Sequence, residues 1–348
     1  MSFRSAAHRV LPLALLGSTM ACALAIPEKV YLDRVAAPGA LTSQVDAVMK
    51  QYEAQGFSGA VLVAKGNRVL LYQGYDYANR ARHLPNTAQT KYPLGALTEP
   101  FTAAVFLQLE REGRLKLDQP ASDWIGPEAG HFTIADLLRR APEAGNLARP
   151  AAFGTGEPSI VDRLAAPSQS YVLLDQVLQA VTGKPPMDVL RDRLFRPAGL
   201  DRTEVDDGKL NDSLVARGYT GAYGSTVVVT GLVAPLGDVF RWHQALRLGL
   251  LLSPADRERM FTDAPNGYGL GWVVHRTPSG ARIVEHASDQ RGFQLWYGYF
   301  PESDQLVLLA VNSDLGYRQP IAERLTQLLV DGEAYAQSLS SGKVGGGS

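Results

Sequence analysis

The chain has 348 residues, with 34 Lys and Arg against 35 Asp and Glu, 45% apolar residues and 20% charged residues. This length allows one large or two ordinary domains with a sizeable core, and the apolar fraction argues against long disorder. The near-neutral charge, without a run rich in Lys or Arg, argues against a nucleic-acid binder. The composition also excludes a collagen, a coiled coil and a polytopic membrane protein.

The N-terminus has the pattern of an export signal. Arg4 and Arg9 precede an apolar run, Val10 to Ala25, which ends in the small-x-small tripeptide Ala-Leu-Ala. A basic start, an apolar middle of about 15 residues and such a cleavage site are typical of a secretory peptide, whereas a spanning helix needs about 20 apolar residues. Cleavage near Ala25 predicts a periplasmic or secreted protein without a membrane span. A retained anchor is the alternative.

The only cysteine, Cys22, lies inside this predicted signal peptide. Its removal leaves no thiol, so the mature protein cannot form a disulfide and must be stabilised by packing in an oxidising compartment. Lipidation of Cys22 is an alternative that the preceding residues, Thr19 to Ala21, support weakly.

The first predicted elements after the leader are a helix and a hairpin. Thr42 or Ser43 can cap the helix, and its apolar positions recur at three- and four-residue spacing. These positions are Val45, Val48, Met49 and Tyr52. Two strands rich in Val and Leu follow at 58–65 and 68–74. Gly66-Asn67 between them suits a two-residue hairpin turn.

A predominantly helical region is predicted at about 85–265. Apolar periodicity places helices in it at 101–112, 171–181, 187–195 and 239–248. Strands return at 268–276, 281–287, 293–300 and 305–312. A last helix carries Ile321, Leu325, Leu328 and Leu329 on one face. Strands at both ends imply one sheet assembled from distant segments, flanked by the first and last helices, with a ligand cleft beside a helical insertion.

The expected organisation is one domain with short extensions. A signal peptide at 1–25 and a Pro-containing lead at 26–40 precede the domain at 41–332, and the helical insertion lies within it. The remaining tail, 333–348, ends in Gly and Ser and is interpreted as a flexible linker.

Several common motifs are missing from the chain. There is no G-x-S-x-G elbow, and the nearest segment, Gly56 to Ala60, leads into a predicted strand. There is no H-E-x-x-H, and the histidines are scattered, so neither a metal nor another cofactor is predicted. Gly267, Gly269 and Gly271 open a predicted strand and no helix, which indicates close backbone packing and not a dinucleotide loop.

An ordered set of segments carries a resemblance to a known family. The segments are KYPLGALTEPFTA at 91–103, LQLEREGRLKLDQPASDW at 107–124, YVLL to GKP at 171–185, FRPAGL at 195–200, YGLGW at 268–272 and Gly292-Phe293. In this order they resemble the serine β-lactamase and penicillin-binding-protein superfamily, particularly its class C-like esterase and D-aminopeptidase branch. The resemblance runs from about residue 41 to 331. It implies an α+β fold of the β-lactamase/transpeptidase type: an antiparallel sheet of about five strands with flanking terminal helices, plus an all-helical lobe.

The first catalytic motif of that superfamily is replaced in this chain. There, a serine in S-x-x-K lies at a helix N-terminus, and the lysine one turn on is its base. The corresponding positions hold Ala96 and Glu99. Alanine has no nucleophilic atom, and a carboxylate in place of an ammonium opposes both a deprotonated hydroxyl and an anionic substrate. Alternatively, Glu99 is a favourable first-turn acid of a helix capped by Thr98.

The second and third motifs are also altered. Tyr-x-Asn corresponds to Ala166-Pro167-Ser168, so the general-base hydroxyl is absent. Lys-Thr-Gly or His-x-Gly corresponds to His286-Ala287-Ser288, followed by Asp289. His286 is kept, whereas Ser288 adds a side chain where the family glycine leaves room for substrate along the strand.

Two functions remain open from the sequence, together with the option of a decaying relative that has no selected role. One is an exported, non-catalytic relative that binds a small molecule or cell-wall fragment in the old cleft, or a protein partner on an outer surface. The candidate ligand contacts are Glu99, Ser168, His286 and Asp289, of which the two carboxylates favour a cationic ligand. The other is an enzyme in which Glu99 or His286 activates water for non-covalent hydrolysis of an amide or ester.

Overall fold

The computed structural model describes residues 35–141, 168–208, 212–221, 226–229, 231–262 and 267–340. The predicted signal peptide with Cys22, the motif position Ala166 and residues 341–348 lie outside the described residues. Within the described ranges, every helix is too short or too polar to cross a membrane.

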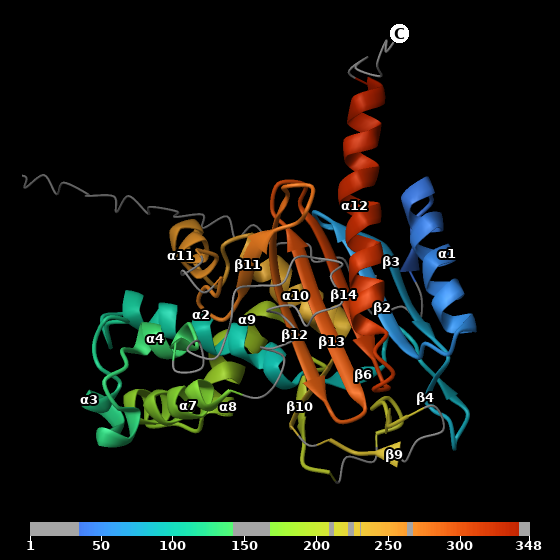
Figure 1. The fold of residues 1–348 in the computed structure, drawn as a ribbon. Coiled ribbons are helices and arrows are strands. Elements are labelled where there is room, and N and C mark those ends of the chain that lie inside the picture. Colours follow the sequence, from blue (N-terminus) through green and yellow to red (C-terminus); the bar gives the residue numbers. More distant parts are fainter. Residues whose placement is uncertain are drawn as a thin grey trace, which may run out of the picture.

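The centre of the fold is an antiparallel sheet of seven strands in the order β1-β3-β2-β14-β13-β12-β11 (Figure 1). The strands are β1 (Val35–Ala36), β2 (Gly59–Lys65), β3 (Arg68–Tyr75), β11 (Val273–Arg276), β12 (Arg282–Gln290), β13 (Phe293–Phe300) and β14 (Gln305–Val311). β2 pairs with β14 in the middle of the sheet, with Gly59 opposite Val311. The expected sheet built from both ends of the chain is therefore confirmed. Its two short edge strands, β1 and β11, take it beyond the expected number of about five.

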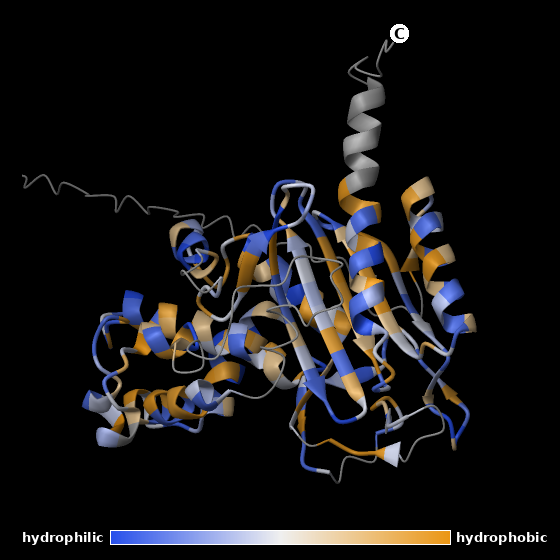
Figure 2. Cartoon of the chain, viewed as in Figure 1, coloured by the Kyte–Doolittle hydropathy of each residue, from blue (hydrophilic) through white to orange (hydrophobic). Residues whose placement is uncertain are grey.

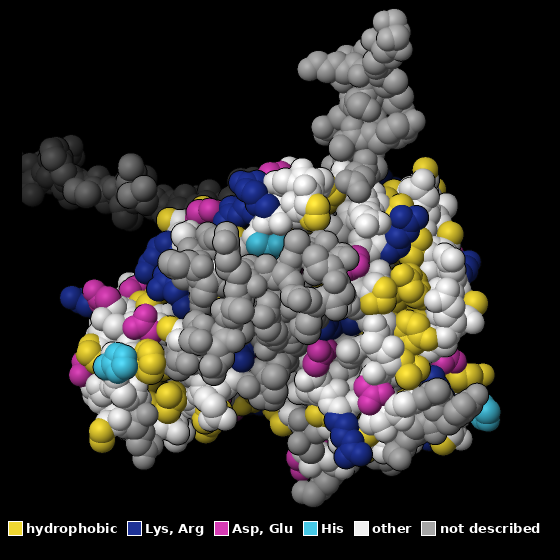
Figure 3. All heavy atoms as spheres, in the orientation of Figure 1, with side chains coloured by type: hydrophobic (Ala, Val, Ile, Leu, Met, Phe, Trp, Pro, Cys, Tyr) yellow, Lys and Arg dark blue, Asp and Glu magenta, His cyan; other side chains and the backbone are white. Residues whose placement is uncertain are grey.

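Helices cover both faces of this sheet. The first helix, α1 (Ala40–Ala54), and the last, α12 (Arg318–Ser340), lie side by side on one face, and apolar side chains gather between them (Figure 3). Alternation along β2 assigns its residues to the two faces: Val61 and Val63 pack in the cluster under α1 and α12, and Leu62 packs in the cluster on the other face. Figure 2 shows hydrophilic and hydrophobic residues alternating along α1, as in a helix with one buried face.

Two predictions about these helices need correction. α1 begins at Ala40 after Gly39 and has no side-chain cap, and the hydroxyl of Thr42 donates instead to the Leu70 carbonyl at 3.5 Å. α12 continues to Ser340, so it extends into the tail at 333–348 that the sequence predicts to be a flexible linker. Residues 333–340 contain neither Gly nor Pro, so nothing in the backbone stops the helix there.

The expected helical lobe is present beside the sheet. Its elements are η2 (Gly95–Thr98), α2 (Glu99–Arg111), α3 (Ser122–Ile125), η3 (Pro127–Ala129), α4 (Ile134–Leu138), α7 (Gln169–Thr182), α8 (Pro186–Leu190), η4 (Arg191–Phe195), α9 (Arg196–Ala198), α10 (Leu236–Arg247) and α11 (Pro254–Met260). Small sheets accompany these helices. They are β6-β10-β7 (Lys91–Pro93, Gly231–Pro235, Glu204–Asp206), β4-β5 (Tyr77–Asn79, Leu84–Pro85) and β8-β9 (Gly218–Tyr219, Thr226–Val227). Residues 226–235 are rich in Val and Thr, which favour strands.

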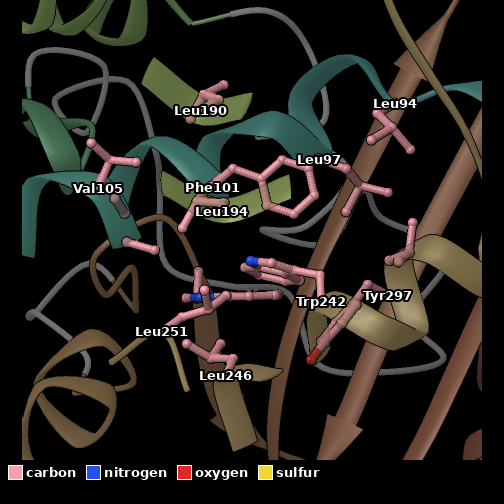
Figure 4. Close-up of a cluster of buried hydrophobic side chains, with 14 of the residues drawn as sticks. Leu94, Leu97, Phe101, Val105, Leu190, Leu194, Trp242, Leu246, Leu251 and Tyr297 are labelled. Carbon is pink, nitrogen blue, oxygen red and sulfur yellow. The ribbon is translucent and has the colours of Figure 1, made fainter. Parts of the chain in front are cut away.

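Helix α2 lies at the centre of the molecule. All its residues from Glu99 to Leu109 are buried, as expected of a helix surrounded by protein. Figure 4 shows Phe101 and Val105 of this helix among apolar side chains that include Trp242 of α10 and Tyr297 of β13. The ring centroids of Phe101 and Trp242 are 4.6 Å apart in an edge-on arrangement. This packing fixes the start of α2 firmly against β12 and α10.

Candidate functional site

The residues that the resemblance assigns to its first and third motifs lie close together, where η2 and the start of α2 approach β12. Ala96 lies in η2, and its backbone N–H donates to the hydroxyl of Ser288 on β12, with 3.0 Å between nitrogen and oxygen. Gly95 permits this approach because its φ is 51° and because a Cβ there would lie 2.3 Å from the Ser288 hydroxyl oxygen. The structure therefore brings Ala96 and Ser288 together.

Glu99 begins α2 and is the centre of a buried polar network. Its side chain is 3% exposed. The Tyr268 hydroxyl donates to Glu99 Oε2 at 2.7 Å, and Arg140 Nη1 lies 3.6 Å from Oε1. His286 Nε2 lies 3.5 Å from Oε2. One carboxylate thus faces three partners that come from three separate parts of the chain.

The hydrogen positions in this network follow from its geometry. His286 Nδ1 lies 2.8 Å from the Ala287 carbonyl oxygen, which can only accept, so Nδ1 carries a hydrogen. His286 Nε2 lies 3.1 Å from the Tyr268 hydroxyl oxygen. Burial, reinforced by the Glu99 carboxylate, raises the pKa of Tyr268 well above its usual value. Tyr268 therefore stays protonated and acts as a hydrogen-bond donor, not as a base.

Arg140 reaches the network from the segment after α4. It is 3% exposed and has a φ of 52°, in the left-handed region that non-glycine residues rarely occupy. Such a backbone costs on the order of 1 kcal/mol and persists where the surroundings hold it. The pairing of its guanidinium with Glu99 supplies such a constraint. Nothing in the sequence motifs singled out Arg140.

Tyr268 is placed by the glycines of the YGLGW segment. Gly271 has a φ of 77°, and a Cβ there would lie 3.1 Å from the Glu99 carbonyl oxygen. At Gly269 a Cβ would lie 2.7 Å from the Met260 carbonyl oxygen. The predicted close packing of these glycines is confirmed, and it lays the loop against the first turn of α2. The sequence had marked this segment as part of the resemblance but had assigned no role to Tyr268.

Part of the alternative interpretation of Glu99 is wrong. Glu99 is a first-turn acid and Thr98 holds the N-cap position, but the Thr98 side chain makes no capping hydrogen bond: its backbone is helical, and its hydroxyl donates to the Gly95 carbonyl oxygen at 2.8 Å. The reason is that η2 runs directly into α2, so the chain has no extended residue at the junction.

The other two candidate ligand contacts lie in different surroundings. Asp289 accepts two hydrogen bonds of 3.1 Å from Nε and Nη2 of Arg318, whose side chain is 6% exposed. Ser168 is buried at the N-terminal end of α7, a helix that packs on α2 and α4. Both carboxylates that suggested a cationic ligand, Glu99 and Asp289, thus have an arginine of the chain itself as partner.

The described residues do not group three His, Cys, Asp or Glu side chains closely enough to hold a metal ion.

The family profile and the similar proteins point to the same family. The profile of the Beta-lactamase family matches residues 45–330. Penicillin-binding protein 4* of Bacillus subtilis is 25% identical over 333 residues, covering 80% of this chain and 73% of that protein. A D-aminopeptidase of Brucella anthropi is 26% identical over 302 residues, covering 74% of this chain and 56% of that protein.

A solved structure agrees with the sequence comparisons in fold. FmtA from Staphylococcus aureus superimposes with a TM-score of 0.70 at 18% identity, covering 86% of this chain and 91% of that one. At this identity the likeness shows the fold, whereas the profile match over most of the chain shows the family. This chain therefore belongs to the β-lactamase family.

Proposed function

We propose that this chain is an exported, non-catalytic member of the β-lactamase family that acts by binding a ligand or a partner. The observation that carries the proposal is the side chain at residue 96. Ala96 occupies the nucleophile position, and its methyl group has no atom that could form an ester with a substrate. The loss of one member of a comparable nucleophile unit in serine proteases lowers the rate by about 10⁴ to 10⁶.

The surroundings of Ala96 support the same proposal. Its amide N–H is the kind of donor that would stabilise an anionic substrate oxygen at a helix start. Here it is bonded to the Ser288 hydroxyl, so it is not available to a substrate in this arrangement. Glu99, at the lysine position, is held by Arg140, Tyr268 and His286. Both features oppose the acylation chemistry of the family.

The direct test is a search for acylation and turnover. The relatives named as penicillin-binding protein and D-aminopeptidase suggest the substrates: a penicillin, a chromogenic cephalosporin, p-nitrophenyl esters and D-amino-acid amides. We expect no mass increase in intact-protein mass spectrometry and no turnover above buffer. A covalent penicillin adduct on the wild-type chain would refute the proposal.

A series of variants that restores the S-x-x-K motif makes this test more specific. Ala96→Ser alone is expected to remain inactive, because Glu99 cannot serve as the base that a lysine would be. Adding Glu99→Lys would bury a second cation beside Arg140, so the informative variant is Ala96→Ser/Glu99→Lys/Arg140→Met. Acylation by penicillin that arises only in this triple variant would identify the replaced side chains as the cause of inactivity. Acylation already in Ala96→Ser would show that Glu99 does not block the chemistry.

Non-covalent hydrolysis is the second candidate, because Glu99, Tyr268 and His286 lie within hydrogen-bonding reach of one another. The burial of these groups opposes it, since His286 is 1% exposed and Tyr268 is fully buried. Turnover by the wild-type chain that disappears in His286→Ala would favour this candidate over the first. Equal background rates in both proteins would eliminate it.

A further inference from the structure

A cavity of about 260 Å³ lies beside the start of α2. Its walls come from β6, η2, α2, α7, α8, β10 and the end of β12. Neither Ala96 nor Glu99 is among the residues that line it, so the cavity is separate from the buried network. It is larger than the cavity of about 150 Å³ that holds benzene in an engineered protein, and smaller than most sites for drug-sized ligands.

Asp175 on α7 supplies a charge to this cavity. Its side chain keeps contact with solvent, and the described part of the chain gives its carboxylate no hydrogen bond or ion pair. Partial burial raises the pKa of Asp175 to about 6, without a contribution from any charged neighbour in the described residues. An exposed carboxylate on the wall of a cavity, without a partner among the described residues, is an open position for a cation.

Other side chains of the wall carry oxygen atoms that can accept a hydrogen bond. Gln290 Oε1 is buried without a hydrogen-bond partner. The single hydroxyl protons of Thr98 and Tyr171 are already donated, to the carbonyls of Gly95 at 2.8 Å and Leu138 at 3.0 Å. These side chains therefore offer acceptors to a ligand. A primary ammonium group, with three donors and a positive charge, is the complementary chemistry.

The rest of the wall is apolar. The lining residues of this kind are Pro93, Pro186, Met187, Leu190 and Leu232. They would contact a hydrocarbon group of the ligand, but they could not stabilise a second charged group, because they offer it no hydrogen bonds in place of water. The complementary ligand thus has one ammonium head and one apolar group of about the size of a benzene ring.

We propose that this cavity binds a small apolar primary amine, with its ammonium held by Asp175 and Gln290 and its hydrocarbon part against Leu190. The inference rests on the proposed binding function, since it names a ligand class for a chain without a nucleophile. The proposed site for a cationic ligand is therefore Asp175 and not Glu99 or Asp289, because each of those two carboxylates is already paired with an arginine.

The test is calorimetric titration of the full chain with three amines: 2-phenylethylamine, isopentylamine and cyclohexylmethylamine. 2-Phenylethanol is the matched neutral probe, because it keeps the ring and replaces the ammonium by a hydroxyl. We expect at least one amine to bind, and to bind more tightly than the alcohol. Asp175→Asn should weaken the binding of that amine by about tenfold or more and change that of the alcohol less than about twofold.

The control variant is Asp201→Asn, which removes an exposed carboxylate that does not line the cavity. It should leave amine affinity unchanged. Gln290→Met, which removes the acceptor at similar size, should weaken both amine and alcohol. Failure of all three amines to bind, or equal amine affinity in Asp175→Asn and wild type, would overturn the inference.

Failure of this inference and failure of the proposed function are distinguishable. If amines do not bind and no acylation or turnover occurs, the chain is still non-catalytic and only the ligand class is wrong. If amines bind while penicillin acylates the wild-type chain, the cavity is correctly assigned and the proposed function is wrong.

Discussion

Two carboxylates next to helix α2 have opposite surroundings. Glu99, in the first turn of α2, is 3% exposed and faces Tyr268, Arg140 and His286. Asp175, on the neighbouring α7, keeps contact with solvent and has no partner in the described residues. A charge withdrawn from water is tolerated when hydrogen bonds and an opposite charge replace its hydration. Glu99 is withdrawn from water and has these replacements, whereas Asp175 stays exposed to water and has no such partner among the described residues.

This difference distinguishes a carboxylate that is paired within the fold from one that a cationic ligand could bind. The resemblance assigns Glu99 to the position of the family lysine, and in the structure its carboxylate is paired with Arg140, which enters from another segment in a left-handed backbone conformation. The charge change at residue 99 is therefore built into the packing of the lobe. Asp175 has no such cation beside it in the described ranges, and a ligand can still supply one.

The largest expected effect on stability comes from removing Arg140, the partner of the buried Glu99 carboxylate. Arg140→Met keeps a Cβ and a long side chain, so the backbone strain is unchanged, but it removes the cation beside Glu99. Breaking a buried ion pair by removing one partner typically costs about 3 to 5 kcal/mol. Because Tyr268 and His286 remain, we expect the free energy of unfolding to fall by about 3 kcal/mol, measured by urea denaturation.

The double variant Arg140→Met/Glu99→Gln is the control for this prediction. With both charges removed, no uncompensated carboxylate is left, so much of the lost stability should return. Additive losses in the two single variants and the double variant would mean that Arg140 and Glu99 do not interact energetically.

The second prediction concerns Gly95, which belongs to both regions. A Cβ there would lie 2.3 Å from the Ser288 hydroxyl oxygen and 2.4 Å from Gln290 Nε2. We expect Gly95→Ala to destabilise the chain by about 2 kcal/mol, part from the φ of 51° and part from displacing the two side chains. Because Gln290 lines the cavity, amine binding should weaken as well.

Gly113→Ala isolates the backbone part of this effect. Gly113 has a φ of 71°, and a Cβ there would meet no atom within 4 Å. The expected loss is about 1 kcal/mol, with amine affinity unchanged. Equal losses in the free energy of unfolding for Gly95→Ala and Gly113→Ala would show that the side chains of Ser288 and Gln290 move aside at no measurable cost.

Most of the fold could be predicted because its signals are local in the sequence. The Gly66-Asn67 turn between β2 and β3, and the limits of β13, were read from turn residues and from runs of Val, Leu and aromatic residues. The strand expected at 268–276 begins only at Val273. The YGLGW segment is apolar enough to resemble a strand, but Gly271 turns it against α2.

The candidate site was predicted in part. The resemblance located Ala96, Glu99, His286 and Ser288, and the structure brings these residues together. The partner Arg140 could not be found, because an isolated arginine after a short helix carries no pattern. Asp175 was not singled out either, since its significance is its place on a cavity wall without a partner among the described residues, which only the three-dimensional surroundings reveal.

A smaller effect is expected at the other paired carboxylate, Asp289. Asp289→Asn removes the charge that faces Arg318 across two hydrogen bonds of 3.1 Å. The Asp289 side chain is 36% exposed, so solvent compensates part of the loss. We expect a decrease of about 1 kcal/mol in the free energy of unfolding, with amine affinity within about twofold of wild type. Loss of amine binding in Asp289→Asn would indicate that the amine binds at Asp289 and not at Asp175.

The smallest effect in stability is expected at Asp175, and its sign is opposite to the others. The pKa of Asp175 is raised from 3.8 to about 6, so between these values the folded chain holds more protons at this group than the unfolded chain does. Stability from this group therefore falls as the pH rises through this window. Asp175→Asn removes that loss, so the variant should be more stable than wild type above pH 6.

The expected gain is below about 1 kcal/mol, because solvent at the exposed carboxylate screens the effect. Urea midpoints of both proteins between acid and neutral pH measure it, and groups that titrate alike in both cancel in the difference. The two curves should converge below the unfolded pKa. An amine at saturating concentration should reverse the order at neutral pH, since it stabilises only the protein that keeps the carboxylate. A variant less stable than wild type at neutral pH without amine would show that Asp175 already has a partner, and the contrast with Glu99 would then fail.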